Sequence, residues 1–319
     1  MPMTLREMHD AHSGKVCDKW DHNLAAYERI FQDFRILPVT MLEIGVQNGG
    51  SLELWSKYFG NGRSFIGCDV DERCSQLTFA DERIHVIVGD SSANATKSRV
   101  LSLASQFDII IDDGSHASGD IVKAFANYFP LLRDDGIYVA EDLHCSYWAG
   151  YDGGLSFPLS SISFFKRLVD LTNREAWGVA IPHGEILADF GNAYGCCFDA
   201  QILQHIYSVE FSNSLCVIRK RDPRDGQLGA RRRAGREAQV QKSVFAESTR
   251  LLAPDQGGNP WAVNPAAALD GQSKNSDQAE HFQIARELDK VRTELSAMRA
   301  SSSWRLTAPL RSVIRAMKS

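Results

Sequence analysis

The sequence contains no long hydrophobic run: none of its apolar stretches approaches the roughly 20 residues that span a bilayer. Its first twelve residues include Arg6, Glu7 and Asp10 and contain no apolar stretch of signal-peptide type. The seven cysteines lack Cys-x-x-Cys spacing, which argues against a disulfide framework or a zinc knuckle. With 44% hydrophobic and 24% charged residues, the 319-residue chain can bury a core. We therefore expect a soluble, cytoplasmic protein with reduced thiols.

Charge divides the chain into two parts. Residues 1–218 hold 16 Lys and Arg against 29 Asp and Glu, whereas residues 219–319 hold 19 against 11. The sequence thus predicts an acidic body and a basic tail. The Arg231–Arg233 run has the charge that attracts nucleic acid, but it has no interleaved aromatic residues and follows an acidic body. We expect no nucleic-acid partner.

The body alternates apolar, β-branched runs with helical segments such as Ser51–Tyr58 and Gly119–Leu132. Five runs have the pattern of buried parallel strands: Val39–Ile44, Ser64–Val70, Ile84–Val88, Phe107–Ile111 and Gly136–Ala140. Two further strands, Ile206–Phe211 and Leu215–Arg219, are joined by Ser-Asn-Ser and form an antiparallel hairpin. This pattern predicts a doubly wound α/β fold with a Rossmann-like, seven-stranded sheet of five parallel strands plus the C-terminal hairpin.

The composition predicts three regions: a domain at 1–221, a disordered linker at 222–280 and a helical basic tail at 281–319. The tail carries two heptads of a coiled-coil seam, formed by Ile284, Leu288, Val291, Leu295 and Met298. An amphipathic helix is predicted over Thr307–Lys318. Three interpretations stay open for the tail: a short coiled coil with a partner, a peripheral contact with the inner face of an anionic membrane, or a solvated segment.

A glycine-containing loop follows the first strand, in Leu42-Glu43-Ile44-Gly45-Val46-Gln47-Asn48-Gly49-Gly50-Ser51, and opens a helix. Such glycines let the backbone approach a ligand closely. The spacing differs from the Gly-x-Gly-x-x-Gly dinucleotide fingerprint, and Glu43 favours a ligand with an ammonium or sulfonium charge over a phosphate. At the end of the second strand, about 20 residues later, Asp69 can accept ribose hydroxyls. Asp90 and Ser91 end the third strand, where a carboxylate can meet an adenine amine.

The order Glu43-x-Gly45, Asp69, Asp90 resembles the class I S-adenosylmethionine-dependent methyltransferases. More narrowly, Lys19-Trp20-Asp21-His22, Tyr27-Glu28 and the loop Glu43–Ser51 are similar to the metal-dependent sugar O-methyltransferases of the macrocin and mycinamicin type. The sequence departs from these at Asn23-Leu24, where an aromatic residue is expected after the histidine. The resemblance implies a set of residues that bind S-adenosylmethionine: Glu43, Gly45, Gly49, Ser51, Asp69, Asp90, Ser91 and Asp112.

Acidic residues follow the fourth and fifth strands, in Asp112-Asp113-Gly114-Ser115-His116 and Glu141-Asp142-Leu143-His144. Neighbouring strands lie about 5 Å apart, so we expect that only a divalent cation makes this crowding tolerable. Oxygen ligands favour Mg²⁺ or Mn²⁺ over Zn²⁺. By resemblance, Asp113, Glu141 and Asp142 are the metal ligands and His116 is the general base. A metal acidifies a sugar hydroxyl, and a histidine, whose ordinary pKa is about 6.5, can accept its proton.

These observations predict an Mg²⁺-dependent O-methyltransferase that acts on a sugar or glycan. The segment Ser302–Arg311 resembles a segment of bacterial glycosyltransferases of surface polysaccharide assembly, which favours polysaccharide or glycoside biosynthesis. Two alternatives remain: an O-methyltransferase of catechol or phenol natural products, and a non-catalytic scaffold of a glycan-assembly complex. Tyr147, Trp148 and Tyr151 either stack on a sugar or pack as a lid, and homo-oligomer formation is left open.

Overall fold

A computed structural model of the chain describes residues 2–259 and, beyond them, residues 262, 264, 288, 291, 292 and 295. The predicted helix at 307–318 lies outside the described residues. Of the predicted coiled-coil seam, Leu288, Val291 and Leu295 are described, and these three are helical and exposed.

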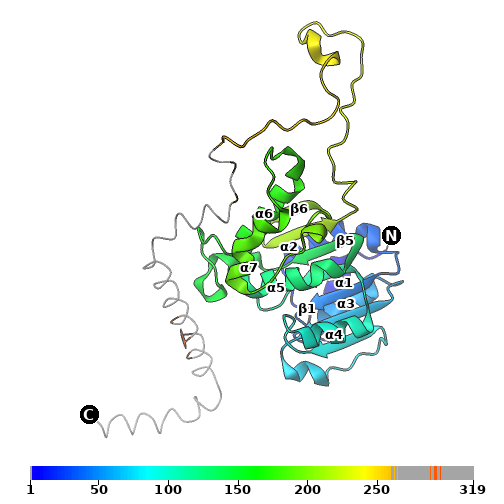
Figure 1. Ribbon diagram of the computed structural model, residues 1–319. Coiled ribbons are helices and arrows are strands. Elements are labelled where there is room, and N and C mark those ends of the chain that lie inside the picture. The colour runs from blue at the N-terminus through cyan, green and yellow to red at the C-terminus, as the bar shows by residue number, and fades with distance from the viewer. Residues whose placement is uncertain are drawn as a thin grey trace, which may run out of the picture.

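A seven-stranded sheet with the order β3-β2-β1-β4-β5-β7-β6 forms the centre of the molecule (Figure 1). Strands β1 to β5 are parallel, and β7 runs antiparallel to both β5 and β6. This confirms the predicted fold class, including the C-terminal hairpin. The strands are β1 Thr40–Ile44, β2 Ser64–Asp69, β3 Ile84–Val88, β4 Phe107–Asp112, β5 Leu132–Ala140, β6 Ile206–Ser212 and β7 Leu215–Lys220.

Helices cover both faces of the sheet, as Figure 1 shows. One face packs against α1 (Leu5–Asp10), α2 (Asp21–Phe31) and α3 (Gly50–Tyr58). The other face packs against a second set: α4 Asn94–Leu103, α5 Ser118–Tyr128, α6 Ser161–Thr172, α7 Ala188–Tyr194 and α8 Ala200–Leu203.

The central strands are buried on both faces, which explains why they appear in the sequence as unbroken apolar runs. In β4, Ile109 and Ile111 point into the core beneath α1 to α3, whereas Ile110 points into the opposite core. All three are fully buried. Asp112 follows this apolar run directly, so its carboxylate lies at the carboxyl edge of the sheet.

The predicted helix Gly119–Leu132 and strand Gly136–Ala140 were wrong at their shared boundary. Helix α5 ends at Tyr128, and Phe129–Leu131 form a short 3₁₀ turn. Pro130 has no amide hydrogen and cannot continue the helix. Strand β5 then begins at Leu132, which pairs with Phe107 before a register shift, so the polar residues Arg133 to Asp135 belong to the strand.

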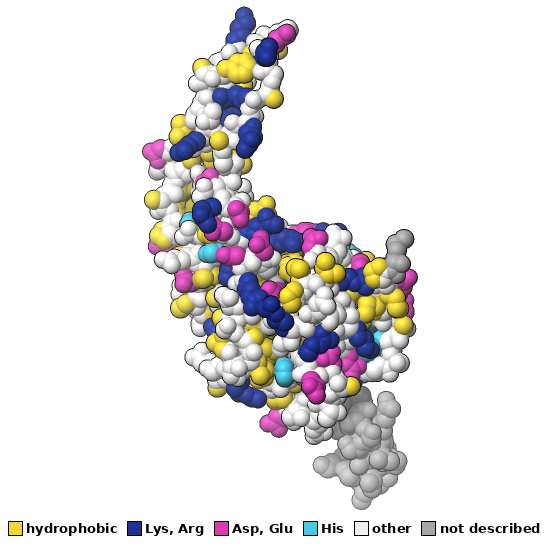
Figure 2. Space-filling model, turned by 90° about the vertical axis from the view of Figure 1, so that its right-hand side faces the viewer, with side chains coloured by type: hydrophobic (Ala, Val, Ile, Leu, Met, Phe, Trp, Pro, Cys, Tyr) yellow, Lys and Arg dark blue, Asp and Glu magenta, His cyan; other side chains and the backbone are white. Residues whose placement is uncertain are grey.

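After β7, residues 222–259 extend from the body as a narrow arm that includes the short 3₁₀ helix Lys242–Phe245 (Figures 1 and 2). Two backbone amides tie this arm to the body: Leu228 donates to Glu175, and Gln256 donates to the carbonyl of Gly178. The predicted division at 221 and 280 stays a prediction. Within the described part of the chain, no helix combines the length and apolarity that crossing a bilayer requires.

Candidate functional site

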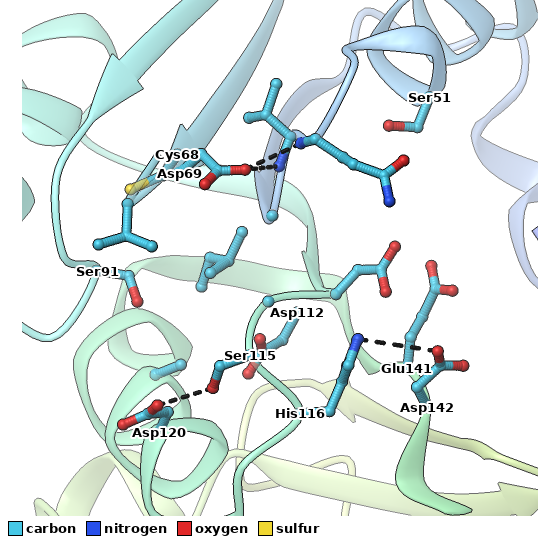
Figure 3. Close-up of a pocket in the computed structure, with 18 of the residues that line it drawn as sticks. Ser51, Cys68, Asp69, Ser91, Asp112, Ser115, His116, Asp120, Glu141 and Asp142 are labelled. Carbon is cyan, nitrogen blue, oxygen red and sulfur yellow. Dashed lines mark hydrogen bonds and ion pairs between the residues drawn. The ribbon is translucent and has the colours of Figure 1, made fainter. Parts of the chain in front are cut away.

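The loop after β1 is held in place by the carboxylate at the tip of β2. Oδ2 of Asp69 accepts the backbone amides of Val46, at 2.7 Å, and Gln47, at 2.9 Å, as Figure 3 shows. Oδ1 accepts the amide of Asp71 at 2.9 Å. A carboxylate has about four acceptor positions, so Asp69 keeps about one for a ribose hydroxyl instead of the two that its predicted role would use.

Gly45 lets the β1 loop cross the β4 loop at close range. Its φ is +95°, and a Cβ at this position would lie 2.0 Å from the carbonyl oxygen of Asp113. The amide of Asp113 also donates to the carbonyl of Ile44 at 2.8 Å. A glycine is therefore required here to place Asp113 beside the end of β1.

A cavity of about 690 Å³ opens at the carboxyl ends of β1 to β5, where ligands bind in open α/β sheets. Of the residues predicted to bind the cofactor, six line it: Gly45, Ser51, Asp69, Asp90, Ser91 and Asp112. The predicted metal ligands and the predicted base, Asp113, Glu141, Asp142 and His116, line the same cavity. These predicted roles stay predictions, but their positions in one cavity are a structural result.

Glu43 and Gly49 do not line this cavity, in contrast to the positions expected for them. The side chain of Glu43 is fully buried and accepts hydrogen bonds from the Ser51 hydroxyl, at 2.6 Å, and the Trp55 indole, at 3.0 Å. Burial raises its pKa. At Gly49, φ is +81° and a Cβ would meet the Phe79 ring at 2.8 Å, so this glycine serves the turn into α3.

Asp112 closes the floor of the cavity at the end of β4. It is 4% exposed, and the Tyr138 hydroxyl donates to its Oδ2 at 3.2 Å. Burial raises the pKa of Asp112 to about 7, although the bond from Tyr138 favours the charged form.

Asp113, His116 and Asp142 form a cluster whose candidate ligand atoms all lie within 4.8 Å of one another. The imidazole of His116 and the carboxylate of Asp142 point toward each other in Figure 3, and Nε2 of His116 lies 3.8 Å from Oδ2 of Asp142. The backbones of His116 (φ +58°) and Asp142 (φ +52°) are both left-handed, a conformation that is uncommon for residues other than glycine. Two carboxylates and an imidazole are a donor set that suits a divalent cation.

The imidazole of His116 keeps an unused nitrogen. Its Nδ1 is buried and has no hydrogen-bond partner among the described residues. Burial lowers the pKa of this histidine, although the neighbouring Asp142 opposes the shift. The lowered pKa favours the neutral ring, and the unpartnered nitrogen is free to accept a proton or bind a ligand.

Glu141 is not part of that cluster, and both of its oxygens accept hydrogen bonds within the protein. It is 2% exposed, and hydrogen bonds reach it from Lys19 at 2.7 Å, from Asn23 at 3.0 Å and from the Tyr27 hydroxyl. Asn23 stands where the resembled proteins suggested an aromatic residue, and here its amide serves as a donor to Glu141 instead.

The expectation that only a divalent cation can offset these acids was wrong. The Lys19 ammonium lies 2.5 Å from Asp113 Oδ2 and 2.7 Å from Glu141 Oε1. Burial alone would lower the pKa of Lys19, but the charges of Glu141 and Asp113 raise it well above its ordinary value. For Asp113, burial and the charge of Glu141 raise the pKa despite this ammonium.

Aromatic side chains border the cluster on its open side. Trp20 is 60% exposed, donates from its indole to Asp142 Oδ1 at 3.1 Å and meets the His144 ring edge-on. Trp148, 51% exposed, contacts both His144 and Tyr151, and Tyr151 lies near His116. These rings therefore connect the N-terminal segment to the loop after β5.

Residues 42–143, which include most of β1, all of β2 to β5 and the strand ends around the cavity, match the family model described as "Methyltransferase domain". The chain is 39% identical over 163 residues to 8-demethyl-8-alpha-L-rhamnosyl tetracenomycin-C 2'-O-methyltransferase of Streptomyces olivaceus, covering 48% of this chain and 42% of that relative. It is 32% identical over 192 residues to demethylmacrocin O-methyltransferase of Streptomyces fradiae, covering 57% and 45%.

A solved structure is also similar: MycE methyltransferase from the mycinamycin biosynthetic pathway, in complex with Mg, SAH and mycinamycin VI. Its TM-score is 0.52 at 26% identity, covering 64% of this chain and 51% of that one. The predicted resemblance to methyltransferases of the macrocin and mycinamicin type is thus confirmed. The chain spans less than half the length of the two curated relatives, and the resemblance of Ser302–Arg311 finds no support in them.

Proposed function

We propose that this domain transfers a methyl group from S-adenosylmethionine to a hydroxyl of a sugar. The observation that carries the proposal is the single cavity that joins the strand-end acids Asp69 and Asp90 to the cluster of Asp113, His116 and Asp142. A donor bound over the first three strand ends then has its methyl group directed at that cluster. Both relatives are named as O-methyltransferases, and the name of the first gives a rhamnosyl compound as its substrate, which supports a sugar as acceptor.

Asp69 and Asp90 hold the nucleoside part of the donor. Asp69 fixes the loop that forms one wall and retains an acceptor position for a ribose hydroxyl. Asp90 lines the cavity next to Ser91 and Ser92, and its Oδ1 accepts the Ser92 amide at 2.8 Å. Its other oxygen is the acceptor that we assign to the adenine amine.

The residues fit a divalent cation. Asp113 and Asp142 would hold Mg²⁺ or Mn²⁺, since both belong to the cluster of close ligand atoms and carry oxygen donors. When bound, such an ion lowers the pKa of a hydroxyl that coordinates it. Asp142 is oriented for this role by the Trp20 indole and, at 3.4 Å, by the Ser214 hydroxyl.

His116 removes the proton. The acceptor oxygen attacks the methyl carbon while the bond from that carbon to sulfur breaks, the hydroxyl proton passes to His116, and a methyl ether and S-adenosylhomocysteine leave. The left-handed backbone of His116 and its contact with Asp142 fix the ring at the cavity wall. The exposed faces of Trp20 and Trp148 lie where the rest of the acceptor would emerge.

The proposal is tested with the full-length protein and labelled S-adenosylmethionine. Binding of S-adenosylhomocysteine is measured by calorimetry, and methyl transfer is measured on sugars with vicinal hydroxyls and on catechols. We expect binding, methylation of a sugar, loss of activity with EDTA and its return with Mg²⁺. If S-adenosylhomocysteine does not bind at millimolar concentration, the proposed function is contradicted. If catechols are methylated faster than every sugar, the acceptor is a catechol and not a sugar.

The finer prediction of a glycan of surface polysaccharide biosynthesis rests on the segment Ser302–Arg311. Nucleotide-linked and lipid-linked sugars in the same panel test it. We expect a linked sugar to be methylated faster than the free sugar if this prediction holds.

A further inference from the structure

Lys19 lies where the two acidic strand ends meet. Its ammonium contacts Asp113 Oδ2 at 2.5 Å and Glu141 Oε1 at 2.7 Å, and it lies 4.0 Å from Oε1 of Glu43. The side chain is 3% exposed. These distances make Lys19 the counter-ion of a buried acidic group, and one of its partners, Asp113, also belongs to the cluster that suits a divalent cation.

We propose that Lys19 is a built-in cation that competes with the divalent metal for Asp113, so that metal binding displaces its ammonium. The inference rests on the metal site of the proposed function. If Asp113 kept its ion pair with Lys19 while it bound a divalent ion, the ammonium and the metal ion would lie close together. The repulsion between these two positive charges raises the energy of the state in which both are bound. Lys19 therefore lowers metal affinity and stabilises the protein before the metal binds.

Displacement also changes what Glu141 can offer. While Lys19 is in place, Glu141 Oε1 carries bonds from both Lys19 and Tyr27, and Oε2 carries one from Asn23. Loss of the ammonium removes one bond from Oε1 and frees Asp113 Oδ2. Glu141 then joins Asp113 and Asp142 as an available acid, which is the three-residue set that the family resemblance implied.

The same exchange involves the N-terminal segment. Lys19 immediately precedes Trp20, whose indole donates to Asp142 Oδ1 at 3.1 Å. Lys15, on the same segment, pairs with Glu53 Oε1 at 2.9 Å, away from the acidic cluster. Metal binding is thus coupled to the position of the Lys19 ammonium but not to that of the Lys15 ammonium. Substitution of Lys15 is therefore a matched control for substitution of Lys19.

Mn²⁺ binding, measured by the electron paramagnetic resonance signal of the free ion, tests the competition in the full-length protein. We expect Lys19→Gln to bind Mn²⁺ about tenfold or more tightly than the wild type, because a competing charge is lost. Lys15→Gln should bind within about twofold of the wild type, since it breaks an ion pair outside the cluster. A purely structural role for Lys19 predicts equal or weaker binding in Lys19→Gln, and that result overturns the inference.

A second measurement on the wild type covers the case in which Lys19→Gln does not fold. The ¹H–¹⁵N spectrum of lysine ammonium groups should show a Lys19 signal, assigned by its loss in Lys19→Arg, that shifts or disappears as Mg²⁺ saturates the protein. The Lys15 signal should stay in place, and an unmoved Lys19 signal at saturation overturns the inference.

The Mn²⁺ experiment also separates failure of the inference from failure of the proposed function. If neither the wild type nor Lys19→Gln binds Mn²⁺ at all, the metal site of the proposed function fails together with the inference. Equal binding in all variants removes the inference alone.

Discussion

The hydroxyl of Ser51 donates to Oε2 of Glu43 across 2.6 Å and so joins the first turn of α3 to the end of β1. The Trp55 indole, one turn further along α3, donates to the other oxygen at 3.0 Å. Both oxygens of this fully buried carboxylate are thereby used within the protein. Glu43 thereby fixes the helix that follows the loop after β1, and its predicted role in binding the cofactor stays a prediction.

Replacement of Glu43 by alanine should therefore lower stability more than it changes ligand chemistry. Glu43→Ala leaves the buried Trp55 indole and the half-buried Ser51 hydroxyl without their acceptor, which we expect to cost roughly 2–4 kcal/mol in the free energy of unfolding. Urea denaturation measures the loss. Glu72→Ala removes an exposed carboxylate on the same side of the sheet and should change stability by less than about 0.5 kcal/mol. Equal stability of the two variants would mean that the Glu43 bonds contribute nothing to the fold.

Asp69 should affect the cofactor through the loop that it holds. In Asp69→Asn, one oxygen becomes an amide donor that faces a backbone amide, so one of the three bonds must break. We expect a loss of about 1–3 kcal/mol in stability and S-adenosylhomocysteine binding at least about tenfold weaker. Calorimetry and thermal unfolding measure the two effects.

Asp90→Asn is the comparison for Asp69. Asp90 accepts one backbone amide, from Ser92, and an asparagine oxygen can still accept it. This variant should bind S-adenosylhomocysteine more weakly while its stability is unchanged. If Asp69→Asn also lost affinity without any loss of stability, its role would be direct contact and not positioning of the loop.

The sheet could be predicted well because its strands are buried on both faces and therefore stand out as apolar runs. Ile109 to Ile111 are an example: all three are fully buried, and three consecutive isoleucines are typical of a strand that is covered on both faces. The start of β5 could not be predicted, because Asp134 and Asp135 are exposed polar residues within a strand. They lie in the irregular stretch between Leu132, which pairs with Phe107, and Ile137, which pairs with Ile109, so no sequence pattern marks them as part of a strand.

The candidate site could be predicted where a residue follows a strand and was missed where it comes from elsewhere in the chain. Asp113 and Asp142 lie at neighbouring strand ends, so topology alone brings them together. Lys19 comes from a segment far from them in sequence and has no periodicity that marks it as a counter-ion. The signal that could have found it is its place in the Lys19-Trp20-Asp21-His22 motif, which is part of the family resemblance.

The two histidines beside Asp142 should differ sharply in their effect on turnover. His116→Gln removes the proposed base and should lower kcat by about 10²–10⁴-fold with unchanged binding of S-adenosylhomocysteine. His144 instead hydrogen-bonds Ser214 at 2.7 Å and packs against Trp20 and Trp148. His144→Gln should therefore leave kcat within about threefold, and a loss there as large as that of His116→Gln would reassign the proton acceptor. Steady-state methyl transfer at saturating donor measures both.

The cysteines should react in an order set by burial, even where they face the cavity. Cys17 lines the cavity, but burial raises its pKa to about 12, and burial also raises that of Cys68 to about 12. At pH 8 a thiol with such a pKa is about 10⁻⁴ thiolate, and only the thiolate reacts quickly with iodoacetamide. Cys197 is exposed, so mass spectrometry should find it alkylated first, with Cys17 and Cys68 unmodified.

The rate of alkylation at Cys17 should also depend on pH. Because a raised pKa keeps the thiol protonated, the rate at Cys17 should rise about tenfold for each pH unit between 8 and 11. In urea all seven thiols should react at similar rates, and alkylation of Cys17 as fast as Cys197 in the folded protein would show that the wall of the cavity is open.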